Sequence, residues 1–302
     1  MVTSALLILV PLFLGFAVPL KRRRRLTVVH HTVNALVYLI LGLLGVGLGQ
    51  IDGLAQQLAA MAVQVSTFVI GLLLVNLAAL WLWHRWQPLQ AGADVVAGPT
   101  SYRRLFLAAL NPLLAVLLGV LAGWLVLPKL ALVEDVATGC LMVLLFLIGL
   151  QLRNAGLSLR RLLVNRQGLG IALTVAGSSV LAGALIAPVL QIPLFHSLAL
   201  SSGFGWYSLS GIVIGDALGP TWGGVAFLND VFREILALAL IPMIIRKSPG
   251  MAIGYGGSTA MDFTLPVIRR SGGLECVPVA IASGFILSFL TPVLMGLFLS
   301  LS

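Results

Sequence analysis

The sequence predicts an all-α integral membrane protein with about eight transmembrane helices and two opposed re-entrant hairpins. Of its 302 residues, 60% are hydrophobic and only 9% are charged, and the mean hydropathy is +1.10. No soluble core could bury that much apolar surface, so lipid must surround the chain. Basic residues stand at the ends of the apolar runs, and glycine and serine interrupt two runs near the carboxy terminus. These three observations together define the fold class.

The first six apolar runs are each close to the roughly 20 residues that a membrane-spanning helix needs. Basic residues at alternate connections orient them, because cytoplasmic loops carry an excess of lysine and arginine. The first run has its basic cluster after the apolar core, which favours a retained helix with the amino terminus outside over a signal peptide. The expected spans are residues 3–20, 33–50, 57–83, 105–127, 134–151 and 168–190.

A hairpin is expected next, because no lysine or arginine occurs in the 66 positions between Arg166 and Arg233. That stretch is too long for one span, and its segment Ser201–Gly211 is rich in glycine and serine, which break helices. Residues 194–218 are therefore predicted to form two half-helices that enter and leave at the outer face. A full span over residues 221–245 follows.

A second hairpin is expected over residues 250–268, where glycine and proline interrupt a weakly apolar run. Basic pairs on both flanks place its entry and exit at the cytoplasmic face. The last span, residues 276–300, then leaves the carboxy terminus outside, on the same side as the amino terminus. Two opposed hairpins, each following a span, are typical of an inverted repeat whose broken helices meet near the midplane of the membrane.

Two regions follow from this reading. Residues 1–150 contain fewer intramembrane charges and are expected to form a helical scaffold that could mediate a homodimer. Residues 151–302 contain both hairpins and are expected to form the transport region.

The net charge of +9 does not indicate nucleic-acid binding, because the basic groups are divided among short separate loops. Such loops meet anionic lipid headgroups instead. No histidine or cysteine cluster has metal-ligand spacing, and no cofactor is expected. A membrane enzyme is also disfavoured. No histidine follows His196 to serve a rhomboid-like serine protease, and Asp216 lacks the Gly-x-Gly-Asp context of a presenilin-like protease.

Four ionisable residues lie within stretches that read as membrane-embedded: Asp230, Arg233, Glu234 and Asp262. A charge at the bilayer centre costs roughly 2.5–3.5 kcal/mol, so such residues predict a transport site. Arg233 lies three residues after Asp230 and is expected to form a structural ion pair with it. Glu234 then lacks a local partner and must bind either a ligand or a proton, because burial favours the neutral form of a carboxyl group.

Asp262 follows the sequence Gly256-Gly257-Ser258-Thr259 inside the second hairpin. An acid at a helix break has access to a cavity and could bind substrate, or it could cap a half-helix, and the two roles can coexist. Nearby polar residues could bind a ligand or, for the hydroxyls of serine and threonine, bond back to backbone carbonyls: Tyr207, Ser208, Ser210, Ser258 and Thr259. His30, His31 and His84 stand at helix ends and are expected to be solvated.

Four segments carry a family resemblance: Phe146 to Asn154, Ser202 to Gly211, Asn229 to Glu234, and Met261 to Pro266 followed by Gly272-Gly273. With these strings the chain resembles the bacterial LysO lysine-exporter family, from end to end and most strongly after residue 140. The resemblance implies an inner-membrane protein that exports L-lysine and its toxic analogue thialysine. It also implies that Glu234 and Asp262 are the essential acids.

Proton antiport is the expected mechanism. Lysine carries a net charge of +1, and moving it out of a negative interior costs about 2.3 kcal/mol per 100 mV. An acid can hold either the lysine ammonium or a proton, so exchange would avoid moving a bare charge through lipid. Sodium remains an alternative coupling ion. Two other functions stay open: a monovalent cation/proton exchanger that uses the same acids, and a non-transporting membrane receptor or assembly subunit.

Overall fold

The computed structural model describes residues 10–19, 23–51, 53–91, 102–125, 132–154 and 165–302. In these ranges all regular secondary structure is helical, and none of them contains a strand. The long helices are α3 (Arg23–Gly49), α4 (Leu54–Trp86), α5 (Tyr102–Leu125), α6 (Leu132–Asn154), α8 (Arg166–Leu190), α11 (Pro220–Ile244) and α14 (Cys276–Ser300). The short ones are α2 (Val10–Ala17), α9 (Leu194–Leu200), α10 (Tyr207–Leu218), α12 (Pro249–Gly256), the 3-10 helix η1 (Gly257–Met261) and α13 (Leu265–Gly272).

Five of the long helices, α3, α4, α5, α8 and α14, are long and apolar enough to cross a membrane. Helix α11 matches α8 and α14 in length, at 25 residues, but carries Asp230, Arg233 and Glu234 in its interior. The chain is therefore an all-helical, multi-pass membrane protein. Residues 3–9 and residue 20 of the first expected span lie outside the described residues.

One helix boundary differs clearly from the prediction. The span expected at residues 33–50 belongs to α3, which begins ten residues earlier at Arg23. Hydropathy locates the part of a helix that lies in lipid, whereas the helix itself continues into the polar interface. The other long helices end within about three residues of the expected limits, which is the usual uncertainty of helix ends.

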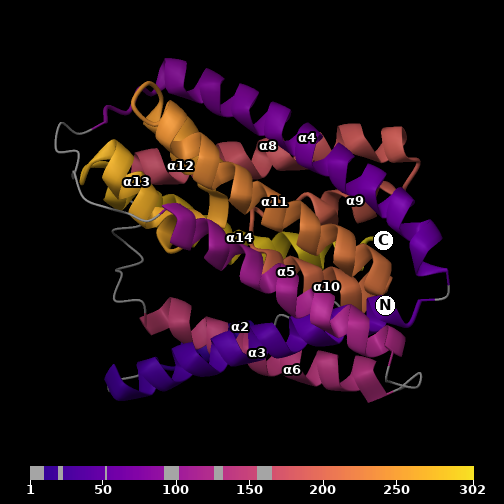
Figure 1. Ribbon diagram of the computed structural model, residues 1–302. Helices are drawn as coiled ribbons and strands as arrows, with labels where there is room; N and C mark the ends of the chain where they lie inside the picture. Colours follow the sequence, from indigo (N-terminus) through magenta and orange to yellow (C-terminus); the bar gives the residue numbers. More distant parts are fainter. Residues whose placement is uncertain (1–9, 20–22, 52, 92–101, 126–131, 155–164) are drawn as a thin grey trace.

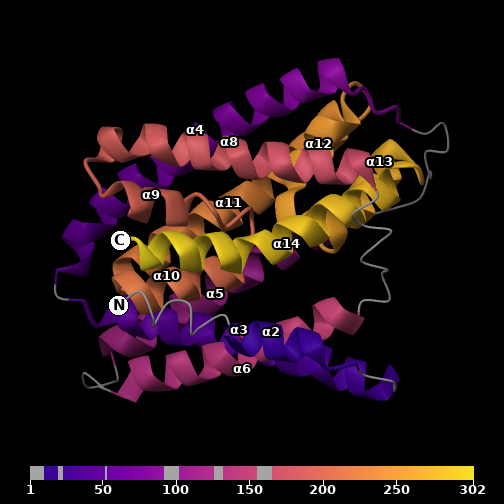
Figure 2. The same cartoon turned by 180° about the vertical axis from the view of Figure 1, so that it is seen from behind.

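The helices form two groups (Figures 1 and 2). Helices α2, α3 and α6 lie side by side along one edge of the molecule, with α5 against α3, and α4 and α8 lie along the opposite edge. The broken helices, α11 and α14 fill the space between them. Small residues allow the first group to pack closely: a Cβ on Gly15 of α2 would collide with the Phe146 carbonyl of α6, and a Cβ on Gly45 of α3 with the Val116 carbonyl of α5.

The division between the groups does not follow residue 150. Helix α4, from the first half of the chain, packs against α8, α11 and α12 of the second half. Its outward face is apolar and open, as at Leu74, which is 62% exposed. An outward apolar face suits lipid rather than water.

Two helix interruptions occur where glycine and serine predicted them. Between α9 and α10 the chain turns through residues 201–206, with positive φ at Phe204 (51°) and Gly205 (87°). Between α12 and α13 it turns through η1 and Asp262, after a positive φ at Gly257 (63°). We call these segments the first tip (residues 201–206) and the second tip (residues 257–264). They meet directly, because the Ser258 N–H donates a hydrogen bond of 3.0 Å to the Phe204 carbonyl.

Candidate functional site

Asp230 of α11 is tied to the first tip. Its side chain is only 1% exposed, and its Oδ1 accepts a hydrogen bond of 2.9 Å from the Gly205 N–H. Its Oδ2 is buried without a hydrogen-bond partner. The tip fits closely around this carboxylate, because a Cβ built on Gly203 would collide with it. Only glycine can therefore occupy position 203 without displacing Asp230.

Arg233 is tied to the element before the second tip. Its Nε donates to the Tyr255 carbonyl at 3.2 Å and its Nη2 to the Gly254 carbonyl at 3.3 Å. Its guanidinium also lies over the Tyr255 ring, 5.2 Å from the centroid. Both carbonyls belong to the last turn of α12, where the helix dipole favours a cation. Arg233 thus caps this helix end with its side chain.

The expected Asp230–Arg233 ion pair takes a different form in the structure. The two charges attract each other electrostatically, but each hydrogen-bonds to a different broken helix. Sequence spacing allowed a direct pair, but Asp230 accepts a hydrogen bond from the first tip and Arg233 donates to the last turn of α12. The result is a clamp in which α11 holds the first tip and the end of α12.

A cavity of about 510 Å³ lies beside this clamp. Six of the predicted site residues line it: Tyr207, Ser208, Glu234, Ser258, Thr259 and Asp262. Asp230 and Ser210 do not line it. Ser210 is fully buried, and its hydroxyl lies 3.4 Å from the Tyr207 carbonyl and also interacts with the Asp230 carboxylate. The volume is typical of a small-molecule site.

The two carboxylates on the cavity come from different elements. Glu234 reaches it from the middle of α11 and is 3% exposed, whereas Asp262 reaches it from the second tip and is exposed. They are close enough to repel each other when both are ionised. Asp262 Oδ1 also accepts from the Phe263 N–H at 2.5 Å, so it satisfies a backbone group of the break while its carboxylate faces the cavity. Asp262 does not cap the following half-helix, because the N-cap residue of α13 is Thr264 and no side chain caps that helix start.

The opposite wall contains residues that the sequence analysis did not assign to the site. His30 and Asn34 of α3 and Gln151 of α6 line the cavity, and Gln151 Nε2 is buried without a hydrogen-bond partner. His30 was expected to be merely solvated. A usable signal was its spacing of four from Asn34, which puts two polar side chains on one face of an otherwise apolar helix.

The cavity extends toward the end of the molecule that is rich in arginine. His30 lies in the second turn of α3, close to Arg23, and Gln151 lies in the last turn of α6, close to Arg153. By contrast, Glu234 lies near the middle of α11. The cavity therefore reaches from the middle of the bundle toward its basic end.

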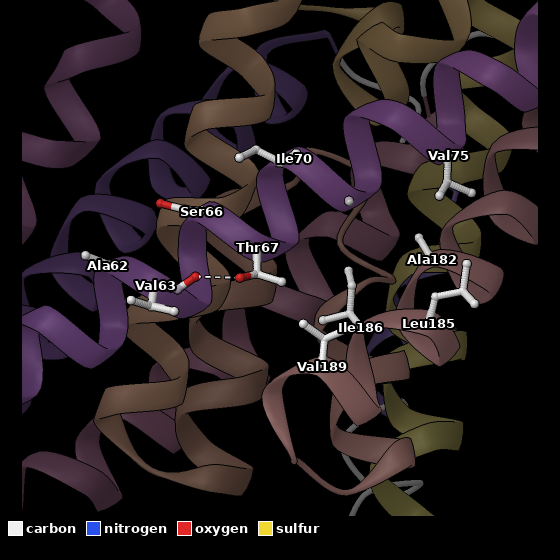
Figure 3. A pocket seen from close by; sticks show the side chains of 11 residues that line it. Ala62, Val63, Ser66, Thr67, Ile70, Val75, Ala182, Leu185, Ile186 and Val189 are labelled. Atoms are coloured by element: carbon white, nitrogen blue, oxygen red, sulfur yellow. Dashed lines mark hydrogen bonds between the residues drawn. The ribbon is translucent and has the colours of Figure 1, made fainter.

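A larger hollow, about 640 Å³, lies between α4 and α8 (Figure 3). Its lining is apolar apart from Ser66 and Thr67, and the Thr67 hydroxyl is occupied by a 2.8 Å hydrogen bond to the Val63 carbonyl. Ile70, Leu185 and Val189 on its rim are more than half exposed. A groove without charge on a lipid-facing surface does not suit a charged substrate, so the smaller cavity is the candidate site.

The groups on the cavity wall are those that hold an organic ligand. Within the part of the chain that the structure describes, no three histidine, cysteine or carboxylate side chains are grouped so that they could hold an ion. The cavity instead offers two carboxylates, several hydroxyls and the amides of an unwound backbone. Such a set can bind a ligand that carries both positive and negative groups.

The chain is similar to known proteins over most of its length. The family model described as "Lysine exporter LysO" matches residues 113–299, which include both tips. "Lysine exporter LysO" of Escherichia coli (strain K12) is 40% identical over 298 residues, 99% of each chain. "Putative lysine exporter" of Haemophilus influenzae (strain ATCC 51907 / DSM 11121 / KW20 / Rd) is 44% identical over 186 residues, covering 62% of this chain and 95% of that protein. No solved structure matches the chain.

Proposed function

We propose that this chain, which belongs to the lysine exporter LysO family, exports L-lysine from the cytoplasm in exchange for protons. The family supports a role in lysine export, and the cavity supports the exchange mechanism. Thialysine, which differs from lysine only in its side-chain backbone, is expected to use the same site.

The observation that carries the proposal is the pair of carboxylates, Glu234 and Asp262, on one intramembrane cavity. Two bare carboxylates in a membrane interior are costly, so each needs either a cation or a proton. Lysine brings two ammonium groups to such a site. When lysine leaves, protons take its place, and the empty carrier can return without uncompensated charge.

The driving force follows from the charges that move. Export of one lysine against one proton is electroneutral and uses only the pH gradient, about 1.4 kcal/mol per pH unit. A second proton would also draw on the membrane potential, about 2.3 kcal/mol per 100 mV for each charge.

The topology that we propose treats α9–α10 and α12–η1–α13 as re-entrant hairpins that enter from opposite faces, among eight spans with both termini outside. Basic residues lie before α12, at Arg246 and Lys247, and in the last turn of α13, at Arg269 and Arg270, which supports a cytoplasmic location for that end. With this orientation the cavity extends toward the cytoplasm, as a lysine-loading state requires. In this proposal the group of α2, α3, α5 and α6 is the scaffold, and a homodimer would form through it.

Two alternatives use the same observations differently. A monovalent cation/proton exchanger could use both acids, but it would not need the hydroxyls and helix end that also line the cavity. A non-transporting receptor would need no titratable pair at all. Neither alternative accounts for the similarity to lysine exporters along 99% of the chain.

Purified protein in proteoliposomes loaded with labelled lysine tests the proposal. Lysine efflux is expected, and it should accelerate when the opposite side is made acidic and be insensitive to a sodium gradient. Glu234→Gln and Asp262→Asn should each reduce efflux at least about 100-fold while leaving the protein folded. Efflux driven only by sodium would reject the proton coupling, and sodium/proton exchange without lysine movement would favour the exchanger.

A further inference from the structure

The lining of the cavity combines a helix start with an unpartnered hydroxyl. Helix α10, 12 residues long, begins at Tyr207, and both Tyr207 and Ser208 line the cavity. The first amides of a helix have no acceptor within the helix. The residue before α10, Trp206, provides no side-chain cap. The start of α10 is therefore a site of positive potential that faces the same space as the two carboxylates.

Ser258 supplies a second and independent observation. Its side chain is only 4% exposed and lines the cavity, and its Oγ has no hydrogen-bond partner. A buried hydroxyl without a partner loses the free energy of one hydrogen bond, which a ligand can restore. The backbone bond from the Ser258 N–H to Phe204 holds this hydroxyl beside the first tip, directly before α10.

We infer that the start of α10 and the Ser258 hydroxyl form a subsite for the α-carboxylate of the amino-acid substrate. This inference rests on the proposed function and specifies how the site recognises its substrate. The amides of Tyr207 and Ser208 and the hydroxyls of Ser208 and Ser258 donate to the carboxylate, an arrangement of charge-assisted bonds at a helix start. The two ammonium groups are left to Glu234 and Asp262.

Separate binding of the carboxylate and the ammonium groups would make the site selective for an amino acid. Two carboxylates alone would bind any diamine or simple cation that fits the cavity. When a decarboxylated or amidated analogue binds, the donors that would surround the carboxylate have no carboxylate to bind. The affinity of the analogue is therefore lower than that of lysine. The subsite therefore separates an amino acid from a polyamine of the same length.

Titration calorimetry on the purified full-length protein in detergent tests the inference, with lysine and lysinamide as ligands. Lysinamide keeps both amino groups and lacks the carboxylate. Ser258→Ala should weaken lysine binding on the order of tenfold, because one charge-assisted hydrogen bond is lost, and change lysinamide binding less than about twofold. Ser208→Ala is the second variant and should shift lysine affinity in the same selective way.

Ser283 is the matched control. Its Oγ is also buried without a partner, but it lies on α14 away from the cavity lining. Ser283→Ala should therefore leave both affinities unchanged. If Ser258→Ala and Ser208→Ala weaken the binding of lysine and lysinamide equally, or weaken the binding of neither ligand, the carboxylate subsite is wrong. That result would leave lysine export unaffected. If the wild-type protein binds no lysine, the proposed function itself fails.

Discussion

Helix α11 contacts both helix interruptions, but it does so through side chains of opposite charge. At the first tip the amide of Gly205 is free for the Asp230 carboxylate. Before the second tip the carbonyls of Gly254 and Tyr255, in the last turn of α12, accept hydrogen bonds from Arg233. Helix α11 carries the matching charges three residues apart. Similar interruptions in sequence therefore need different partners, because a chain that turns before a helix exposes N–H groups and one that turns after a helix exposes C=O groups.

Two acids of α11 look equivalent in the sequence but have different contacts in the structure. Asp230 and Glu234 lie one turn apart on α11, but Asp230 is directed to a backbone amide and Glu234 to the cavity. We assign the first to holding the tips and the second to the substrate. Substitutions that remove one contact at a time can test this assignment.

Replacing Arg233 by methionine should break the clamp most severely. The carbonyls of α12 lose their donor, and the buried Asp230 carboxylate loses its countercharge, which typically costs about 3–5 kcal/mol. A large drop in thermal unfolding temperature in detergent is expected. The double variant Asp230→Asn with Arg233→Met should be less destabilised than Arg233→Met alone. Equal destabilisation would mean that the charge of Asp230 does not depend on Arg233.

Replacing Gly203 by alanine should displace the Asp230 carboxylate from the first tip, because the new Cβ has no space. Overpacking of this kind costs about 1–3 kcal/mol, measured as a lower unfolding temperature. Gly177 of α8 is the control, since a Cβ there meets nothing within 4 Å. Gly177→Ala should be neutral or slightly stabilising. An unchanged unfolding temperature in Gly203→Ala would refute the close fit of the tip around Asp230.

Lysine binding should become tighter as pH rises, because protons and ammonium groups compete for Glu234 and Asp262. If binding releases one proton, affinity rises up to about tenfold per pH unit, or 1.4 kcal/mol, while an acid is still protonated in the empty site. Above that range the affinity should level off. Calorimetry across pH measures it, and Glu234→Gln should flatten the slope. The same slope in Asp230→Asn as in wild type would support the separation of the two acids, whereas a flat wild-type profile would contradict proton exchange.

Replacing His30 by alanine should have the smallest effect, a two- to fivefold increase in the lysine concentration for half-maximal transport, since one polar wall residue at the cavity end is lost. His31 is the neighbouring control, because it is exposed and does not line the cavity. His31→Ala should transport as wild type does. Identical behaviour of the two variants would remove His30 from the transport path.

Much of the site could be predicted from residue types alone. Glu234 and Asp262 stood out because carboxyl groups are expensive in lipid, and the hydroxyls next to the breaks stood out because glycine and serine interrupt helices. His30, Asn34 and Gln151 did not stand out in this way. They come from α3 and α6, which both precede the two tips in the sequence, and only packing brings them to the same cavity.

The sequence by itself determined that this protein is helical and crosses the membrane, where its helices break, and which charges lie in its interior. Those properties depend on transfer free energies and backbone conformations that each residue carries with it. Only the tertiary structure decided which partner each buried charge takes. Spacing puts Arg233 within reach of Asp230, but hydrogen-bonding groups contributed by distant helix ends compete for both, and that competition depends on where the tips come to lie.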